Sequence, residues 1–149
     1  MKIKVLPKIQ FDKSFSDFKK GGNKKFSDYT STAFISILDP DNEEELYPSS
    51  SNFLQVRMWD IEKTLVLDEK NYLTVTSDNV LIKIIAFCQD HKDKDFIIHC
   101  SAGISRSGAI ARFIHEKNNS DDFYNENPYI QPNLYVLNRL KELDNILQS

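Results

Sequence analysis

The segment from Asp95 to Cys100 places the strongest limit on how this chain of 149 residues can fold. It reads DFIIHC and is apolar almost throughout. A short apolar run of this kind is typical of a strand that is covered on both faces, as in parallel sheets. We therefore predict that residues 95–100 form a buried strand at the centre of a sheet.

The other elements are predicted from hydrophobic periodicity. Strands are expected at Lys2–Leu6, at Ala33–Leu38 and at Phe53–Trp59. Apolar residues at helical spacing predict helices over 77–91, 104–117 and 134–146, and a polar segment with two prolines predicts a connecting loop over 118–133. Strands that alternate with helices indicate an α/β domain with a central, mostly parallel sheet flanked by helices.

Length and composition predict one domain over residues 1–149. Hydrophobic residues make up 40% of the chain and charged residues 28%, which is enough apolar surface for a core. A formal net charge of -3 does not supply the positive field that nucleic-acid binding requires. The longest apolar stretch, Val80 to Cys88, is far shorter than the roughly 20 residues that span a bilayer. No nucleic-acid or membrane partner is therefore expected, and the oligomeric state stays open.

The start of the chain and its two cysteines indicate where the protein works. Residues 1–7 alternate charged and apolar side chains and lack the apolar stretch of a secretory signal. Two cysteines, Cys88 and Cys100, are too few for a disulfide scaffold. We expect free thiols and a cytoplasmic location. Cys88 lies on the apolar stripe of its predicted helix, which favours a packed core thiol over a redox partner of Cys100.

A turn of seven residues, Ser101 to Ser107, leads from the central strand directly into the helix that follows. Such a junction points backbone N–H groups and the positive end of a helix into one cavity, which suits a phosphate dianion. The same field favours the thiolate form of Cys100. Gly103 permits a positive φ, so the loop can close tightly around an anion. Arg106, one of only four arginines, supplies a planar fork that grips two phosphate oxygens at once.

The run HCSAGISRS, from His99 to Ser107, resembles the phosphate loop of the cysteine-based protein tyrosine and dual-specificity phosphatases. The resemblance implies that Cys100 attacks phosphorus and forms a cysteinyl-phosphate. It implies that Arg106 and the loop bind the phosphate oxygens, that Ser107 eases the departure of sulfur, and that His99 orders the loop. The implied phosphate-binding positions are Ser101, Ala102, Gly103, Ile104, Ser105 and Arg106. No metal and no cofactor is implied.

Phosphoryl transfer to sulfur also requires a proton for the leaving oxygen, which a carboxylic acid on another loop can donate. Asp60 is the preferred candidate, because MWD at 58–60 ends a predicted strand and resembles the acid loop of small phosphatases. Asp68 and Asp78 are the alternatives. Asp60 also has a plainly structural interpretation, as a residue that caps a turn.

The loop also indicates the class of substrate. Its side chains carry no charge before Arg106, whereas family members that act on inositol lipids often place lysines there. The chain is similar to the compact dual-specificity branch, which implies a phosphorylated protein as substrate: phosphotyrosine, with phosphoserine and phosphothreonine left open. Two alternatives stay open: a phosphoprotein-binding module without turnover, and a sulfur enzyme similar to rhodanese or arsenate reductase.

Overall fold

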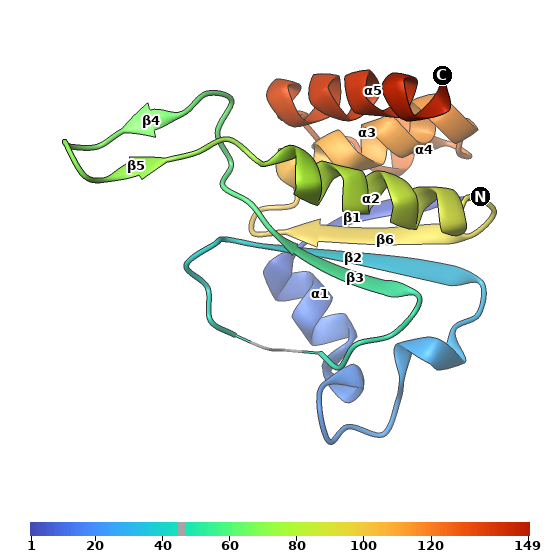
Figure 1. Ribbon diagram of the computed structural model, residues 1–149. Coiled ribbons are helices and arrows are strands. Elements are labelled where there is room, and N and C mark those ends of the chain that lie inside the picture. Colours follow the sequence, from blue (N-terminus) through green and yellow to red (C-terminus); the bar gives the residue numbers. More distant parts are fainter. Residues whose placement is uncertain (45–46) are drawn as a thin grey trace.

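The computed structural model describes residues 1–44 and 47–149, and its centre is a parallel sheet of four strands (Figure 1). The strands lie in the order β1 (Ile3–Pro7), β6 (Asp95–Cys100), β2 (Thr32–Leu38) and β3 (Phe53–Arg57). The central, parallel sheet is confirmed, and β6 lies inside it as predicted. Because the strands are parallel, their carboxyl ends meet at one edge, where β6 delivers Cys100.

Helices cover both faces of the sheet. The helices are α1 (Lys8–Ser14), α2 (Asp78–Asp90), α3 (Arg106–Asn118), α4 (Phe123–Glu126) and α5 (Leu134–Gln148). Figure 1 shows α2, α3 and α5 on one face and α1 on the other. None of the helices within 1–44 and 47–149 combines the length and the apolar character needed to cross a membrane.

Two of the three predicted helices, α2 and α5, begin after a residue whose side chain accepts a hydrogen bond from the first turn. Ser77 precedes α2 and accepts a hydrogen bond from the N–H of Val80. Asn133 precedes α5 and accepts from the N–H of Val136 at 3.0 Å. Both Ser77 and Asn133 are ordinary N-caps.

Several elements were missed or misplaced by the sequence prediction. The short helix α1 and the hairpin β4 (Leu65–Val66) with β5 (Tyr72–Leu73) were not predicted, and α4 interrupts the segment predicted to be a loop over 118–133. β3 ends two residues before Trp59, and α3 begins two residues after Ile104. Helices α1 and α4 and the β4–β5 hairpin are too short to show a hydrophobic period. Helix α1 buries a single residue, Phe11.

The two faces of the sheet have different cores. On the face covered by α2, α3 and α5 the buried side chains are mainly aliphatic. On the α1 face they are mainly aromatic: Leu6, Phe11, Phe18, Phe26, Phe34, Tyr47 and Phe53. Neighbouring residues of β6 belong to opposite faces, because side chains alternate along a strand. Cys100 faces the aliphatic core, and the ring of His99 packs against Phe11 with centroids 4.3 Å apart.

Candidate active site

Cys100 is the last residue of β6 and lies almost completely buried at the start of the loop. Its Sγ is 2.9 Å from Oγ of Ser107, the second residue of α3. Ser107 is itself fully buried. The strand and the helix therefore hold a thiol and a hydroxyl in direct contact, seven positions apart in the chain.

The loop backbone is turned so that its carbonyl groups are held by outside partners. The carbonyls of Ser101, Ile104 and Ser105 accept from the N–H groups of Lys8, Gln131 and Asn133 at 3.0–3.1 Å. Within the described part of the chain, the N–H groups of 102–105 donate to no hydrogen-bond partner. They remain available to an anion, together with the positive end of α3.

Gly103 is needed for this loop to fit beneath the end of β1. Its φ is +70°, in the left-handed region that the sequence analysis expected. A Cβ at this position would lie 2.6 Å from the backbone of Leu6 and Pro7. Any larger residue would therefore push the loop away from β1 as well as strain its backbone.

Arg106, the first residue of α3, is 4% exposed. Nη1 donates to Oδ1 of Asp39 at 2.6 Å and to the carbonyl of Met58 at 2.8 Å, and Nη2 donates to Oγ of Ser101 at 3.1 Å. Nε is buried and has no hydrogen-bond partner among the described residues. A buried donor without a partner is costly, and a bound phosphate oxygen would satisfy it.

His99 lies on the opposite face of β6 and is completely buried. Its Nε2 is 2.6 Å from Oγ of Ser36 on β2, and its Nδ1 is 3.4 Å from the carbonyl of Cys100. Because a carbonyl only accepts, both contacts are satisfied when Nδ1 carries the proton and Ser36 donates to Nε2. Burial lowers the pKa of His99 to about 4, so the ring is neutral at neutral pH.

Of the three candidate acids, only Asp60 contacts the loop. Oδ1 of Asp60 accepts from Oγ of Ser105 at 2.7 Å, and its side chain is exposed. Asp68 instead accepts from the backbone and side chain of Asn71 in the β4–β5 hairpin, and these hydrogen bonds lower its pKa. Asp78 is paired with Arg139 at 2.7 Å, which lowers its pKa as well. Asp68 and Asp78 therefore form hydrogen bonds with residues outside the loop.

Solved structures with a similar fold are found among phosphatases and related proteins. The PTP-2 phosphatase of Cydia pomonella is 19% identical and has a TM-score of 0.53, over 95% of this chain and 85% of its own. The chain therefore has the fold of this phosphatase. Human tyrosine phosphatase-like serine/threonine/tyrosine-interacting protein is 16% identical with a TM-score of 0.49, over 99% of this chain and 93% of its own. No protein-family model matches the sequence, and neither does any curated protein.

Two residues that contact the predicted site residues, Asp39 and Asn133, were not predicted from the sequence. Asp39 follows β2 and pairs with Arg106, and Asn133 donates to Oδ1 of Asp60 at 3.1 Å and to the carbonyl of Ile61. One signal was available for Asp39: it ends a predicted strand, and the ends of parallel strands meet at one edge. Nothing local marks Asn133, because its sequence context is that of a helix cap.

The second cysteine of this fold lies away from the loop. Cys88 is buried on α2 among aliphatic side chains, and burial raises its pKa to about 12. A thiol of this kind stays protonated and unreactive. Neither Cys88 nor Cys100 forms a disulfide. The prediction of a packed core thiol is consistent with this position.

No metal centre is visible in the ranges 1–44 and 47–149, where no three His, Cys, Asp or Glu side chains are grouped to hold an ion. The polar groups on the loop that follows Cys100 and at the start of α3 are instead the guanidinium of Arg106, the hydroxyl of Ser107 and the backbone N–H groups of residues 102–105. This set of donors binds anions, and its chemistry is that of a phosphate or sulfate site.

Proposed function

We propose that the protein hydrolyses phosphate monoesters on proteins, phosphotyrosine first, through a cysteinyl-phosphate intermediate. The observation that carries this proposal is the arrangement at the carboxyl end of β6. Sγ of Cys100 contacts the hydroxyl of Ser107. The loop that follows Cys100 has N–H groups without partners among the described residues, and it leads to Arg106, whose buried Nε has no hydrogen-bond partner there. A nucleophile and donors for an anion therefore share one site.

In the first step the thiolate of Cys100 attacks phosphorus, so that an S–P bond forms while the bond from phosphorus to the leaving oxygen breaks. Arg106 and the loop N–H groups hold the three remaining oxygens as charge is redistributed. Asp60 in its acid form donates a proton to the leaving oxygen. Its Oδ1 already accepts two hydrogen bonds, from Ser105 and Asn133, so Oδ2 is the oxygen that carries this proton.

In the second step water attacks phosphorus and the S–P bond breaks. The carboxylate of Asp60 takes the proton from the attacking water, and inorganic phosphate is released. The departing sulfur becomes a thiolate, and the hydroxyl of Ser107, already 2.9 Å away, donates a hydrogen bond to it. Charge-assisted hydrogen bonds of this kind are stronger than neutral ones and make the thiolate a better leaving group.

Turnover of phosphotyrosine, phosphoserine and phosphothreonine peptides and of inositol phosphates tests the proposal. We expect release of inorganic phosphate from the phosphotyrosine peptide by the wild type and by Cys88→Ala. Cys100→Ser should lower the rate by about 10⁴–10⁶-fold, because nothing replaces the nucleophile. Equal rates for the wild type and Cys100→Ser would show that Cys100 is not the nucleophile.

The same preparation separates the two alternatives. A binding module without turnover would bind the phosphotyrosine peptide and release no phosphate. A sulfur enzyme would form a persulfide on Cys100 when given thiosulfate and would leave an aryl phosphate intact. The proposal predicts phosphate release and no persulfide.

A further inference from the structure

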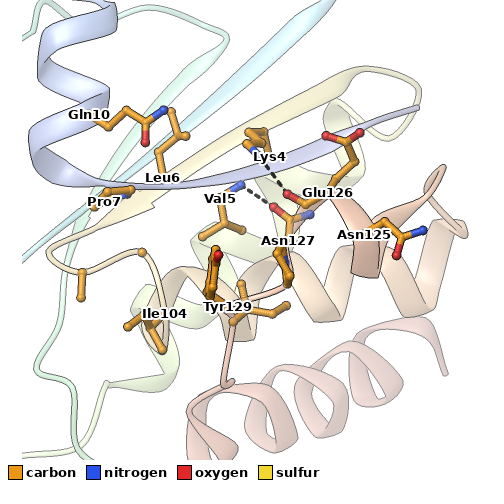
Figure 2. Close-up of a pocket in the computed structure, with 14 residues that line it drawn as sticks. Lys4, Val5, Leu6, Pro7, Gln10, Ile104, Asn125, Glu126, Asn127 and Tyr129 are labelled. Atoms are coloured by element: carbon orange, nitrogen blue, oxygen red, sulfur yellow. Dashed lines mark hydrogen bonds between the residues drawn. The ribbon is translucent and has the colours of Figure 1, made fainter.

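An apolar groove in the described part of the chain lies beside the loop, and most of its lining residues play no part in the chemistry derived above. Its volume is about 600 Å³, within the usual range for ligand sites. The end of β1 forms one wall, and residues 125–130 form another. Figure 2 shows the groove with its lining residues drawn as sticks.

The groove adjoins the loop of the proposed phosphate site, although Cys100, Arg106 and Asp60 do not line it. Ala102, Gly103 and Ile104, whose N–H groups are free for an anion, also line the groove. A peptide whose phosphate sits on the loop would therefore bring its neighbouring residues to this wall.

The rim of the groove exposes apolar surface that has no covering partner in the described chain. Tyr129 is 81% exposed and Ile104 is 37% exposed. The charged side chains among the described lining residues are Lys4 and Glu126, and the ammonium of Lys4 donates to the carbonyl of Glu126 at 2.8 Å. Opposite charges within one groove do not favour a strongly anionic or cationic ligand.

The groove also borders the outer edge of the sheet, where Asn127 covers part of β1 and its Nδ2 donates to the carbonyl of Ile3 at 2.8 Å. β1 is an edge strand, and the N–H of Val5 points away from β6 and donates to Oδ1 of Asn127 at 2.8 Å. In an extended strand the carbonyl of a residue points to the same side as its N–H. The carbonyl of Val5 therefore faces the groove, where it can accept from the backbone of an extended peptide.

We infer that this groove binds an apolar residue adjacent to the phosphorylated residue of a protein substrate, held in extended form against Val5, Ile104 and Tyr129. The inference rests on the proposed function and adds a substrate preference to it. The preferred substrate carries leucine or a similar side chain next to phosphotyrosine, and aspartate at the same position is disfavoured.

Two sets of phosphotyrosine peptides test the inference, with leucine or aspartate at each of the two positions before and after phosphotyrosine. Binding to the Cys100→Ser protein is measured by fluorescence anisotropy, so the result does not depend on turnover. We expect the best leucine peptide to bind about fivefold to tenfold more tightly than its aspartate partner, from partial burial of one side chain. Equal affinities at all four positions would overturn the inference.

The variant Tyr129→Ala, made in the same protein, checks that the preference arises in the groove. It should reduce the leucine preference to less than about twofold. Tyr124→Ala is the matched control, because Tyr124 is also an exposed tyrosine but does not line the groove. If Tyr129→Ala leaves the preference intact, or Tyr124→Ala removes it equally, the groove is not the binding site.

An activity measurement separates failure of this inference from failure of the proposed function. A small aryl phosphate such as para-nitrophenyl phosphate does not reach the groove. Its hydrolysis by the otherwise native enzyme should be unchanged by Tyr129→Ala. If the aryl phosphate is hydrolysed but the peptides show no preference, the inference is wrong and the function stands. If the aryl phosphate is not hydrolysed at all, the proposed function is wrong, and the binding data still decide the inference.

Discussion

The two faces of the sheet support the loop in different ways. On the face covered by α2, α3 and α5, Cys100 lies in an aliphatic core and contacts Ser107 of α3. On the α1 face, its neighbour His99 is enclosed by Phe11 and held by Ser36. Because side chains alternate along β6, the reactive Cys100 and the structural His99 lie on opposite faces of the sheet. We expect substitutions on the face of α2, α3 and α5 to alter reaction rates, and substitutions on the α1 face to alter mainly the stability of the protein.

The largest expected effect among the groups around Cys100 belongs to Asp60. Asp60→Ala should lower the phosphotyrosine turnover rate by about 10²–10⁴-fold, because the leaving oxygen loses its proton donor. Peptide affinity in equilibrium binding should be little changed. Asp68→Ala and Asp78→Ala are the controls and should retain the wild-type rate. If one of these controls loses activity while Asp60→Ala does not, the acid has been assigned to the wrong loop.

Arg106 supplies the next largest effect. Arg106→Lys keeps the charge but loses the planar fork, and it should lower kcat/KM for an aryl phosphate by about 10²–10³-fold. Arg112→Lys changes an exposed arginine of the same helix, paired with Glu116 at 2.9 Å, and should have no effect. Equal activity of the two lysine variants would remove the guanidinium from the mechanism.

Ser107 should affect one step of the reaction more than the other. Ser107→Ala removes the hydrogen bond to sulfur and should slow breakdown of the intermediate by about 10–100-fold, the value of a hydrogen bond to a charged group. Rapid mixing with an aryl phosphate should then show a burst of phenol close to one equivalent of enzyme, followed by slow turnover. A fall in rate without any burst would place Ser107 in the first step instead.

His99, on the α1 face, should make the free energy of unfolding depend on pH. Folded His99 takes up a proton only near pH 4, whereas an unfolded histidine does so near 6.5. Between these values the unfolded chain binds more protons, so acid favours unfolding. His99 should remove at most about 3 kcal/mol from the free energy of unfolding as the pH falls from 6.5 to 4.

Urea denaturation at several pH values measures this effect. His99→Gln should be less stable than the wild type at pH 7 and should lose less further stability between pH 6.5 and 4. His91→Gln is the control and should keep the wild-type slope in that window. A wild-type slope in His99→Gln would assign the acid sensitivity to other groups.

Much of the fold could be predicted because its main elements carry their own signals. β6 is apolar almost throughout, α2 and α5 have clear periodicity, and each of these helices begins at a side chain that caps it. The loop was recognised because its residues are contiguous in the sequence. Short elements such as α1 and α4 have no period of their own and depend on tertiary packing.

The supporting residues of the site could not be found in the same way. Asp39 and Asn133 reach Arg106 and Asp60 across 67 and 73 positions of the chain. Their roles depend on which strand ends and helix starts meet in space, and a local pattern does not contain that information. The candidate acids show the same limit, because contacts with residues distant in the chain, such as the hydrogen bonds from Ser105 and Asn133 to Asp60, distinguish Asp60 from Asp68 and Asp78.

Direct detection of phosphate on Cys100 tests the central proposal most sharply. The Ser107→Ala protein is mixed with an aryl phosphate, quenched rapidly, digested and analysed by mass spectrometry. We predict a phosphate adduct on the peptide that contains Cys100, and none on the peptide that contains Cys88 or in the Cys100→Ser protein. Turnover without any adduct, or an adduct on another residue, would contradict the proposal that the sulfur of Cys100 carries the phosphoryl group.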